Sequence, residues 1–174
     1  MRVYVLFAIL VMACLVSCTI GAVEPDTEKE SALPPITQTG ERTFGCLVNG
    51  EVWVTKNSIK ANAVYQFGVL QIGASIDELE RDQSLGLRID SSIISESVFM
   101  IDSTVGQNAN AAFNNSTDGC DYDYNDTVDG MIYISKFTLN RPKIVSGTFE
   151  FTTVTNNCDT IKVTEGRFDL SLTQ

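Results

Sequence analysis

The residues best suited to chemistry lie in an acidic stretch, DGCDYDYNDTVDG. Asp121, Asp123 and Asn125 have the spacing of the first three ligands of a calcium-binding loop. Asp126 occupies the position that requires glycine, and Ile132 the position that requires a bidentate glutamate, so the stretch is not an EF-hand. An acidic surface loop is the simpler interpretation. The alternative is an irregular Ca²⁺ site formed by four aspartates, Asp118, Asp121, Asp123 and Asp126.

Signatures of catalysis are mostly absent. The chain contains no histidine, which excludes Ser-His-Asp and Cys-His arrangements. It has no glycine-rich phosphate loop and no H-E-x-x-H zinc motif. A glycosidase needs only two carboxylates, but the acidic residues here alternate outward along predicted strands. We therefore expect no enzymatic activity, and a carboxylate-based hydrolase is kept as an alternative.

Aromatic side chains offer a second kind of candidate site, a flat platform for sugar rings. Trp53 alternates within a predicted hairpin, which favours a place in the core over a binding surface. The full set of candidates is Trp53, Tyr65, Tyr122, Tyr124 and Tyr133.

Three tripeptides resemble an O-glycosylation acceptor motif of certain bacteria, Asp followed by Ser or Thr and then an aliphatic residue or Thr. They predict acceptors at Ser103, Thr127 and Thr160. Patterns this short recur by chance in a chain rich in Ser and Thr, and Thr160 also fits a strand. A glycan at any of these positions would be a bulky, solubilising surface group.

The charge balance restricts the partners. The chain has 12 basic and 22 acidic residues, a formal net charge of −10. Removing residues 1–17 takes away only Arg2 among the charged residues, which leaves 11 − 22 = −11. A chain this acidic repels phosphate backbones, so we expect no nucleic-acid partner. It also repels an anionic membrane surface, so membrane attachment needs another means.

The N-terminus indicates how the chain is held at a membrane. Arg2 precedes an apolar run over residues 3–15, which is shorter than the ~20 residues that span a bilayer but typical of a secretory signal peptide. The run leads into LVSC, which resembles the lipobox of bacterial lipoproteins. The resemblance implies cleavage after residue 17 and acylation of Cys18, with palmitate among its acyl chains. Several acyl chains hold a protein in the leaflet, whereas a single chain binds marginally.

Two regions follow the predicted signal peptide, residues 1–17. Residues 18–40 are acidic, poor in aromatics and interrupted by prolines, so we expect the lipidated cysteine to be followed by a flexible tether. Residues 41–174 have the composition of one globular domain. Thr19 stands where some bacteria place the Asp that retains lipoproteins at the inner membrane. We therefore expect a cell-envelope protein anchored in the outer membrane, facing the periplasm or the surface.

The cysteines predict one disulfide. Beyond Cys18, the mature chain contains Cys46, Cys120 and Cys158, and an odd number allows at most one internal bridge. Cys46 shares a predicted strand face with Phe44, as a small buried hydrophobic residue does. Cys120 and Cys158 lie in polar segments that an antiparallel meander brings together. The predicted bridge is therefore Cys120–Cys158.

The apolar positions repeat with a period of two, as in strands with one buried face. Asn49-Gly50 predicts a hairpin, because both residues tolerate the positive φ of a type I′ turn. Residues 75–83 are the one helix candidate, although a long hairpin loop or a single helical turn fits them better. The remaining predicted strands cover residues 61–74, 84–90, 97–101, 131–139, 144–154, 159–164 and 167–172. The pattern predicts an all-β domain, an antiparallel β-sandwich or flattened barrel of roughly eight to eleven strands.

Segments at both ends of the domain carry a family resemblance. TFGCLVNGEVW (43–53), SGTFEF (146–151) and TEGRFDLSL (164–172) are similar to an uncharacterised family of Bacteroidetes-type outer-membrane lipoproteins. Its members share a lipobox, a linker of the LPP type (33–35 here) and one β domain. The resemblance covers residues 75–130 poorly. It implies the fold and the location, and it brings no activity and no site residues.

Together these features predict a lipid-anchored envelope protein whose β domain binds a glycan or another envelope protein without catalysis. A structural or accessory component of an envelope complex is the first alternative, and the carboxylate-based hydrolase is the second. We expect no cofactor apart from the Ca²⁺ considered above.

Overall fold

The computed structural model describes residues 32–173, apart from 56–57, 93 and 103–107. The regular elements of this part are eleven β-strands and one 3-10 turn, η2 (Ser58–Lys60). The prediction of an all-β domain is therefore confirmed. The strands are β1 (Thr43–Val48), β2 (Glu51–Val54), β3 (Ala61–Gln66), β4 (Val69–Glu78), β5 (Arg81–Asp90), β6 (Ser97–Asp102), β7 (Ala109–Asn115), β8 (Cys120–Tyr122), β9 (Thr127–Thr138), β10 (Ile144–Thr153) and β11 (Ile161–Thr173).

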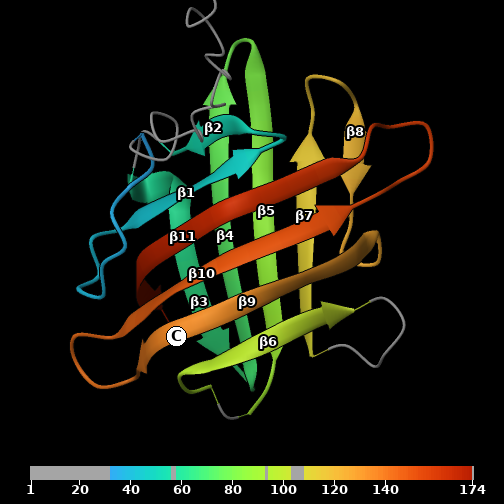
Figure 1. The fold of residues 1–174 in the computed structure, drawn as a ribbon. Helices are drawn as coiled ribbons and strands as arrows, with labels where there is room; N and C mark the ends of the chain where they lie inside the picture. Colours follow the sequence, from blue (N-terminus) through green and yellow to red (C-terminus); the bar gives the residue numbers. More distant parts are fainter. Residues whose placement is uncertain (1–31, 56–57, 93, 103–107, 174) are drawn as a thin grey trace, which may run out of the picture.

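The strands lie in two layers that cross at a steep angle (Figure 1). The front layer has the order β6-β9-β10-β11-β1-β2, and the back layer has the order β3-β4-β5-β7-β8. Within each layer the neighbouring strands are antiparallel. The end of β11 joins the layers by pairing in parallel with β3, at Leu172↔Ala63 and Thr173↔Val64. The described strands thus form one mixed, open sheet folded over itself as a sandwich.

The last strand takes part in both layers because it is long and bent. β11 contains a residue of positive φ, Glu165 (53°), and the register of its neighbours shifts beside that residue, between Gly45 and Leu47 in β1 and between Phe149 and Phe151 in β10. A β-bulge of this kind bends a strand and increases its twist. The two short strands predicted for residues 159–164 and 167–172 are therefore one bulged strand.

The core lies between the layers and is formed by the inward faces that the period of two predicts. Leu85, Leu87 and Ile89 of β5 are each at most 2% exposed. In the front layer Phe44 packs against Trp53 and Phe149, with ring centroids 5.8 and 5.1 Å away. Aromatic pairs at these separations add about 0.5–1.5 kcal/mol each beyond their buried area.

Several predicted boundaries differ from the structure. The chain turns at Phe67 and Gly68, both with positive φ (53° and 80°), so residues 61–74 are not one strand. Phe is uncommon in that conformation, and the residue types therefore do not mark the turn. Residues 75–83 are neither a long loop nor a helical turn, because Glu78 pairs directly with Arg81 across a tight hairpin. β7 and β8 lie in a stretch that carries no strand prediction.

The end of the predicted tether lies on the domain. Leu33 is 6% exposed, and the following residues lie against Asp169 of β11. The prediction of a flexible segment over residues 18–40 therefore does not hold for residues 32–40. The Asp169 carboxylate accepts hydrogen bonds from Thr37 Oγ1 (2.7 Å), Thr39 N (3.0 Å), Gly40 N (2.8 Å), Glu41 N (3.2 Å) and Ser146 Oγ (2.6 Å).

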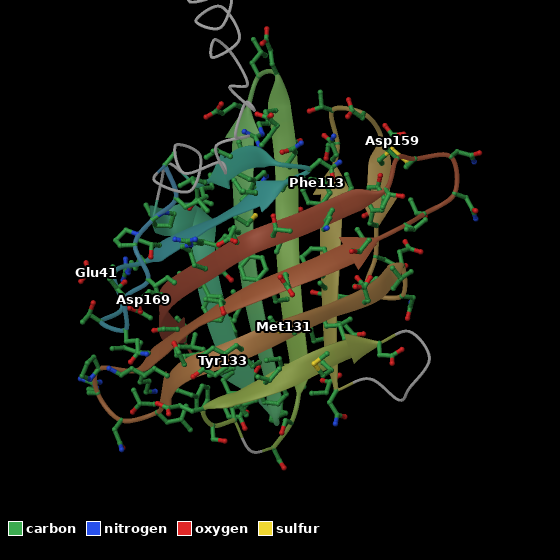
Figure 2. All side chains as sticks on the ribbon, in the orientation of Figure 1. Glu41, Phe113, Met131, Tyr133, Asp159 and Asp169 are labelled. Atoms are coloured by element: carbon green, nitrogen blue, oxygen red, sulfur yellow. A yellow bond between two sulfur atoms is a disulfide. The ribbon has the colours of Figure 1, made fainter. Side chains whose placement is uncertain are left out.

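Asp169 remains charged although it is only 1% exposed. Burial acts to raise the pKa of its carboxyl, but the hydrogen bonds from Ser146, Thr37 and the backbone favour the charged form and lower that pKa to about 2. Figure 2 shows Glu41 and Asp169 together at one side of the front layer. A buried carboxylate thus fixes the segment that leads into β1.

Candidate functional site

A cavity of about 480 Å³ opens at one end of the sandwich. Four segments that are distant in the sequence form its walls: the β1–β2 hairpin, the start of β5, the β7–β8 region and the β10–β11 loop. Binding pockets for small molecules have volumes of roughly 300–1,000 Å³. The lining residues are Val48, Asn49, Glu51, Arg81, Gln83, Phe113, Asn115, Asp118, Cys120, Tyr122, Asn157, Cys158, Asp159 and Ile161.

The apolar part of the cavity wall includes Val48, Ile161 and two aromatic residues, Phe113 and Tyr122. Phe113 and Tyr122 are each 1% exposed, and their centroids lie 6.2 Å apart. The Tyr122 hydroxyl donates to the Asp159 carbonyl at 2.5 Å. Burial, and after it the carboxylates of Asp159 and Asp118, raises the pKa of Tyr122. The phenol therefore stays neutral, and its proton is already used to anchor the β10–β11 loop.

A hydrogen-bonded group connects Arg81 to the core. Arg81 donates through Nε to Gln83 Oε1 (2.9 Å) and through Nη1 and Nη2 to the Val52 carbonyl (3.3 Å each). Gln83 Oε1 also accepts from Trp53 Nε1 at 3.0 Å. Since Arg81 belongs to the back layer and Val52 to β2, these bonds fix the distance between two walls of the cavity.

Asn115 presents an unsatisfied acceptor at the cavity. Its Nδ2 donates to Asp118 Oδ2 at 2.6 Å, whereas its Oδ1 is buried and has no hydrogen-bond partner in the structure. Buried polar atoms are nearly always paired, and leaving one unpaired costs about 1–3 kcal/mol. A ligand or water that donates to Oδ1 would remove this cost.

The disulfide holds two walls of the cavity together. Cys120 at the start of β8 is bonded to Cys158 in the β10–β11 loop, with a Cα–Cα distance of 6.1 Å, which confirms the predicted pair. Cys46 is free and buried, as predicted. Burial strongly raises the pKa of its thiol, so Cys46 is not a nucleophile at neutral pH.

The cavity lies within a segment that a family model matches. The model is described as Domain of unknown function (DUF6252), and it matches residues 41–169. The chain belongs to this family. No curated protein and no solved structure matches it. The start of the match coincides with the predicted start of the globular domain, and all four cavity walls belong to the DUF6252 domain.

The structure does not assemble the predicted calcium site. The described part of the DUF6252 domain contains no group of three or more His, Cys, Asp or Glu residues placed to hold a metal ion. Asp118 faces the cavity and accepts from Asn115. Asp123 and Asp126 instead stabilise their own turn, because they accept from the backbone N–H groups of Asn125 (2.7 Å) and Asp123 (3.0 Å). Asp121 lies exposed on β8.

The predicted aromatic platform is not formed either. Trp53 and Tyr122 are buried, and Tyr65 packs edge-on against Phe137 at 5.2 Å. Tyr124 is half-buried, and burial raises the pKa of its hydroxyl. Tyr133 is 38% exposed, but it lies on the outer face of β9, away from the cavity.

The predicted modification sites differ in accessibility. Thr127 is fully buried and its hydroxyl donates to the Ala111 carbonyl at 2.6 Å, so the folded DUF6252 domain has no room for a sugar there. Thr160 is exposed. Ser103, Cys18 and the predicted signal peptide lie outside the described residues. No described helix is long and apolar enough to cross a membrane.

Only some of the residues that form the cavity are ones that the sequence motifs point to, namely Asp118, Tyr122 and the two bridged cysteines. Arg81, Gln83 and Asn115 belong to no motif, and more than thirty positions along the sequence separate Arg81 from Asn115. The one useful signal was the cysteine pair, which predicts that the segments around Cys120 and Cys158 meet.

Proposed function

We propose that this chain is a lipid-anchored envelope protein whose DUF6252 domain binds a small polar ligand in the cavity without catalysis. The unsatisfied Asn115 Oδ1 carries the proposal, since it lies in a cavity of about 480 Å³ with an aromatic wall and several polar groups. This combination of apolar surface and a few convergent polar groups is typical of small-molecule sites. The sequence predicts either a glycan or a protein as the partner. The cavity favours the glycan, because it is the smaller of the two.

The proposed location depends on Cys18 and on the charge. The net charge of the chain would keep it away from anionic lipid. Acyl chains on Cys18 would nevertheless hold it at the outer membrane. The segment over residues 32–40 is fixed on the domain by Asp169, so only the residues before it separate the domain from the bilayer.

We expect no catalysis in the cavity. The chain has no histidine, and the one arginine of the cavity is bound to Val52 and Gln83. A hydrolase would have to use two of the cavity carboxylates, Glu51, Asp118 and Asp159, as acid and base. Asp118 already accepts a hydrogen bond from Asn115, so one of its oxygens is engaged within the protein.

The only tryptophan offers a direct test. Trp53 donates to Gln83, and Gln83 lines the cavity. We expect a ligand from a mixed library of sugars, amines and carboxylates to change the Trp53 emission and to raise the melting temperature. A ligand at a hundred times its Kd stabilises by about 2.7 kcal/mol, or roughly 5–10 °C for a domain of this size. If no compound changes either signal, the cavity is not a binding site.

A second candidate function, an accessory component bound to another envelope protein, is favoured by an apolar patch on the front layer. β6 is an edge strand, and its outward residues Val98 and Met100 lie opposite Tyr133 and Met131 of β9. Val98, Met100 and Tyr133 are 52%, 65% and 38% exposed. Figure 2 shows Met131 and Tyr133 on the front layer, far from Phe113. We call these four residues the β6–β9 patch.

Co-purification tests this second candidate. We expect the full-length protein extracted from membranes to retain a partner that is lost on the substitution Met100→Glu. Leu79→Glu is the matched control, because Leu79 is fully exposed at the tip of the β4–β5 hairpin, outside the patch. A partner that neither substitution removes would rule out the β6–β9 patch as its binding surface.

A further inference from the structure

We infer that the ligand of the cavity is a neutral, hydroxyl-rich molecule, a small sugar. This inference rests on the proposed function and specifies its ligand. It depends on the charges around the cavity, on their spacing and on the apolar wall.

The charges of the cavity disfavour an anion. Three carboxylates line it, those of Glu51, Asp118 and Asp159, against one guanidinium, that of Arg81. Arg81 already donates to Val52 and Gln83. A phosphate or carboxylate ligand would therefore meet net negative charge and a cation whose donors are partly used. Like charges at these separations repel.

The spacing of the same carboxylates disfavours a cation. Among the residues that the structure describes, no three acidic side chains converge in a way that could hold a metal ion. Asp118 is bonded to the Asn115 amide, while Glu51 and Asp159 come from different walls. A compact cation needs several ligands around one point, whereas acceptors distributed around a rim suit a molecule with several separate donors.

A sugar has that distribution of donors. Its hydroxyls could donate to Asn115 Oδ1, which lacks a partner, and to the rim carboxylates. A guanidinium has five N–H donors, of which the bonds to Gln83 and Val52 use three, so Arg81 has donors left for hydroxyl oxygens. The C–H face of a sugar ring is apolar and can lie against the apolar lining of the cavity, which includes Val48 and Ile161 beside the buried rings of Phe113 and Tyr122.

The test is calorimetric titration of the unlipidated mature chain, residues 18–174 with Cys18→Ser, with glucose, galactose, mannose, N-acetylglucosamine and their β-linked disaccharides. At least one sugar should bind. The substitution Asn115→Ala should then weaken binding about tenfold, the equivalent of one lost hydrogen bond. The matched control is Asn110→Ala, because Asn110 lies on the same strand and faces outward; it should leave the Kd unchanged.

A second variant covers the case in which Asn115→Ala fails to fold. Asp159 lies in an exposed loop, and its carbonyl rather than its carboxylate anchors Tyr122, so Asp159→Ala should fold and still weaken sugar binding several-fold. Unchanged affinity in both variants would overturn the inference.

Three further probes, spermidine, Ca²⁺ and citrate, separate the inference from the proposed function. If spermidine, Ca²⁺ or citrate changes the Trp53 emission and no sugar does, the ligand is not a sugar, but the cavity is still a binding site. If no probe binds, both claims fail. A disaccharide that binds and is recovered intact supports the non-catalytic function, and its cleavage would overturn that function.

Discussion

The two polar atoms of the Asn115 side chain differ in their hydrogen bonding, and this difference makes Asn115 a candidate ligand-binding residue. The nitrogen is bound to Asp118, which fixes the orientation of the side chain. The oxygen is then left buried and unpaired at the cavity. An acceptor held in place before the ligand arrives loses little freedom on binding, which is how rigid sites gain affinity.

Replacement of Asp169 should destabilise the domain. We expect Asp169→Asn to lower the free energy of unfolding at pH 7 by roughly 2–3 kcal/mol, because five donors converge on its carboxylate and its pKa falls from 3.8 to about 2 on folding. Denaturant titration measures the change. Asp129→Asn, an exposed position on β9, is the control and should change stability by less than about 0.5 kcal/mol.

The same carboxylate predicts a pH dependence. A carboxyl group whose pKa is lower in the folded state than in the unfolded state stabilises the fold at pH values above its unfolded-state pKa. This stabilisation is lost as the pH falls through the folded-state pKa. The wild-type chain should therefore lose this stability between about pH 5 and pH 2, and Asp169→Asn should remove that part of the loss. Equal acid profiles for both chains would show that the carboxylate does not hold residues 37–41 in solution.

The Cys120–Cys158 bridge acts at the scale of elements, since it connects β8 to the β10–β11 loop across a sequence separation of 38. Replacing both cysteines with Ser should lower the free energy of unfolding by roughly 3–4 kcal/mol and loosen two walls of the cavity. Calorimetric melting measures the first effect.

Thiol titration of the mature lipidated chain in denaturant provides a check of the bridge itself. We expect one free thiol, from Cys46, before reduction and three free thiols after it. Three before reduction would contradict the bridge.

The β9–β10–β11 meander requires glycine where its strands approach closely. A Cβ on Gly147 would overlap the Tyr133 carbonyl oxygen and lie 2.7 Å from Phe168 Cζ. Gly147→Ala should therefore lower the melting temperature, at a cost of about 1–3 kcal/mol. Gly73→Ala in β4 is the control, because its Cβ would find only Asn62 Oδ1, at 3.7 Å, and it should be neutral or slightly stabilising. Equal melting temperatures would contradict the packing described for β10.

The sequence pattern predicts the strands well where one face is buried and the other is polar. Leu85, Leu87 and Ile89 alternate with polar residues, and β5 is found there. Asn49-Gly50 predicts the first hairpin because its turn chemistry is local. The turn at Phe67 is not predictable in this way, since a bulky residue with positive φ is held there by the surrounding structure.

The cavity is not predictable from the sequence either, and the reason is different. Its walls come from four segments, and only the folding of the sheet over itself, through the parallel pairing of β11 with β3, brings them together. Residue types such as Asn115 and Gln83 are unremarkable in a linear reading. The acidic stretch was conspicuous, but Asp123 and Asp126 bind their own backbone, which is the usual local role of aspartate in turns.

At the scale of the whole molecule, the proposed lipid anchor on Cys18 would decide where the cavity operates. We expect mass spectrometry of the native protein to show a chain that begins at Cys18 and carries acyl groups. Cys18→Ala should move the protein from the membrane fraction to the soluble fraction, because the remaining chain, with a charge of 11 − 22 = −11, has no affinity for anionic lipid. An unmodified wild-type chain in the soluble fraction would contradict the proposed location.

The most direct test of a ligand site in the cavity is an ¹⁵N NMR map of the mature chain with the best compound of the library. The binding account predicts that the Trp53 indole N–H and the amides of residues 49–51, 81–83, 113–122 and 157–161 shift together, because these segments form the cavity. Shifts confined to Val98, Met100, Met131 and Tyr133 would contradict it and would place the binding surface on the β6–β9 patch instead.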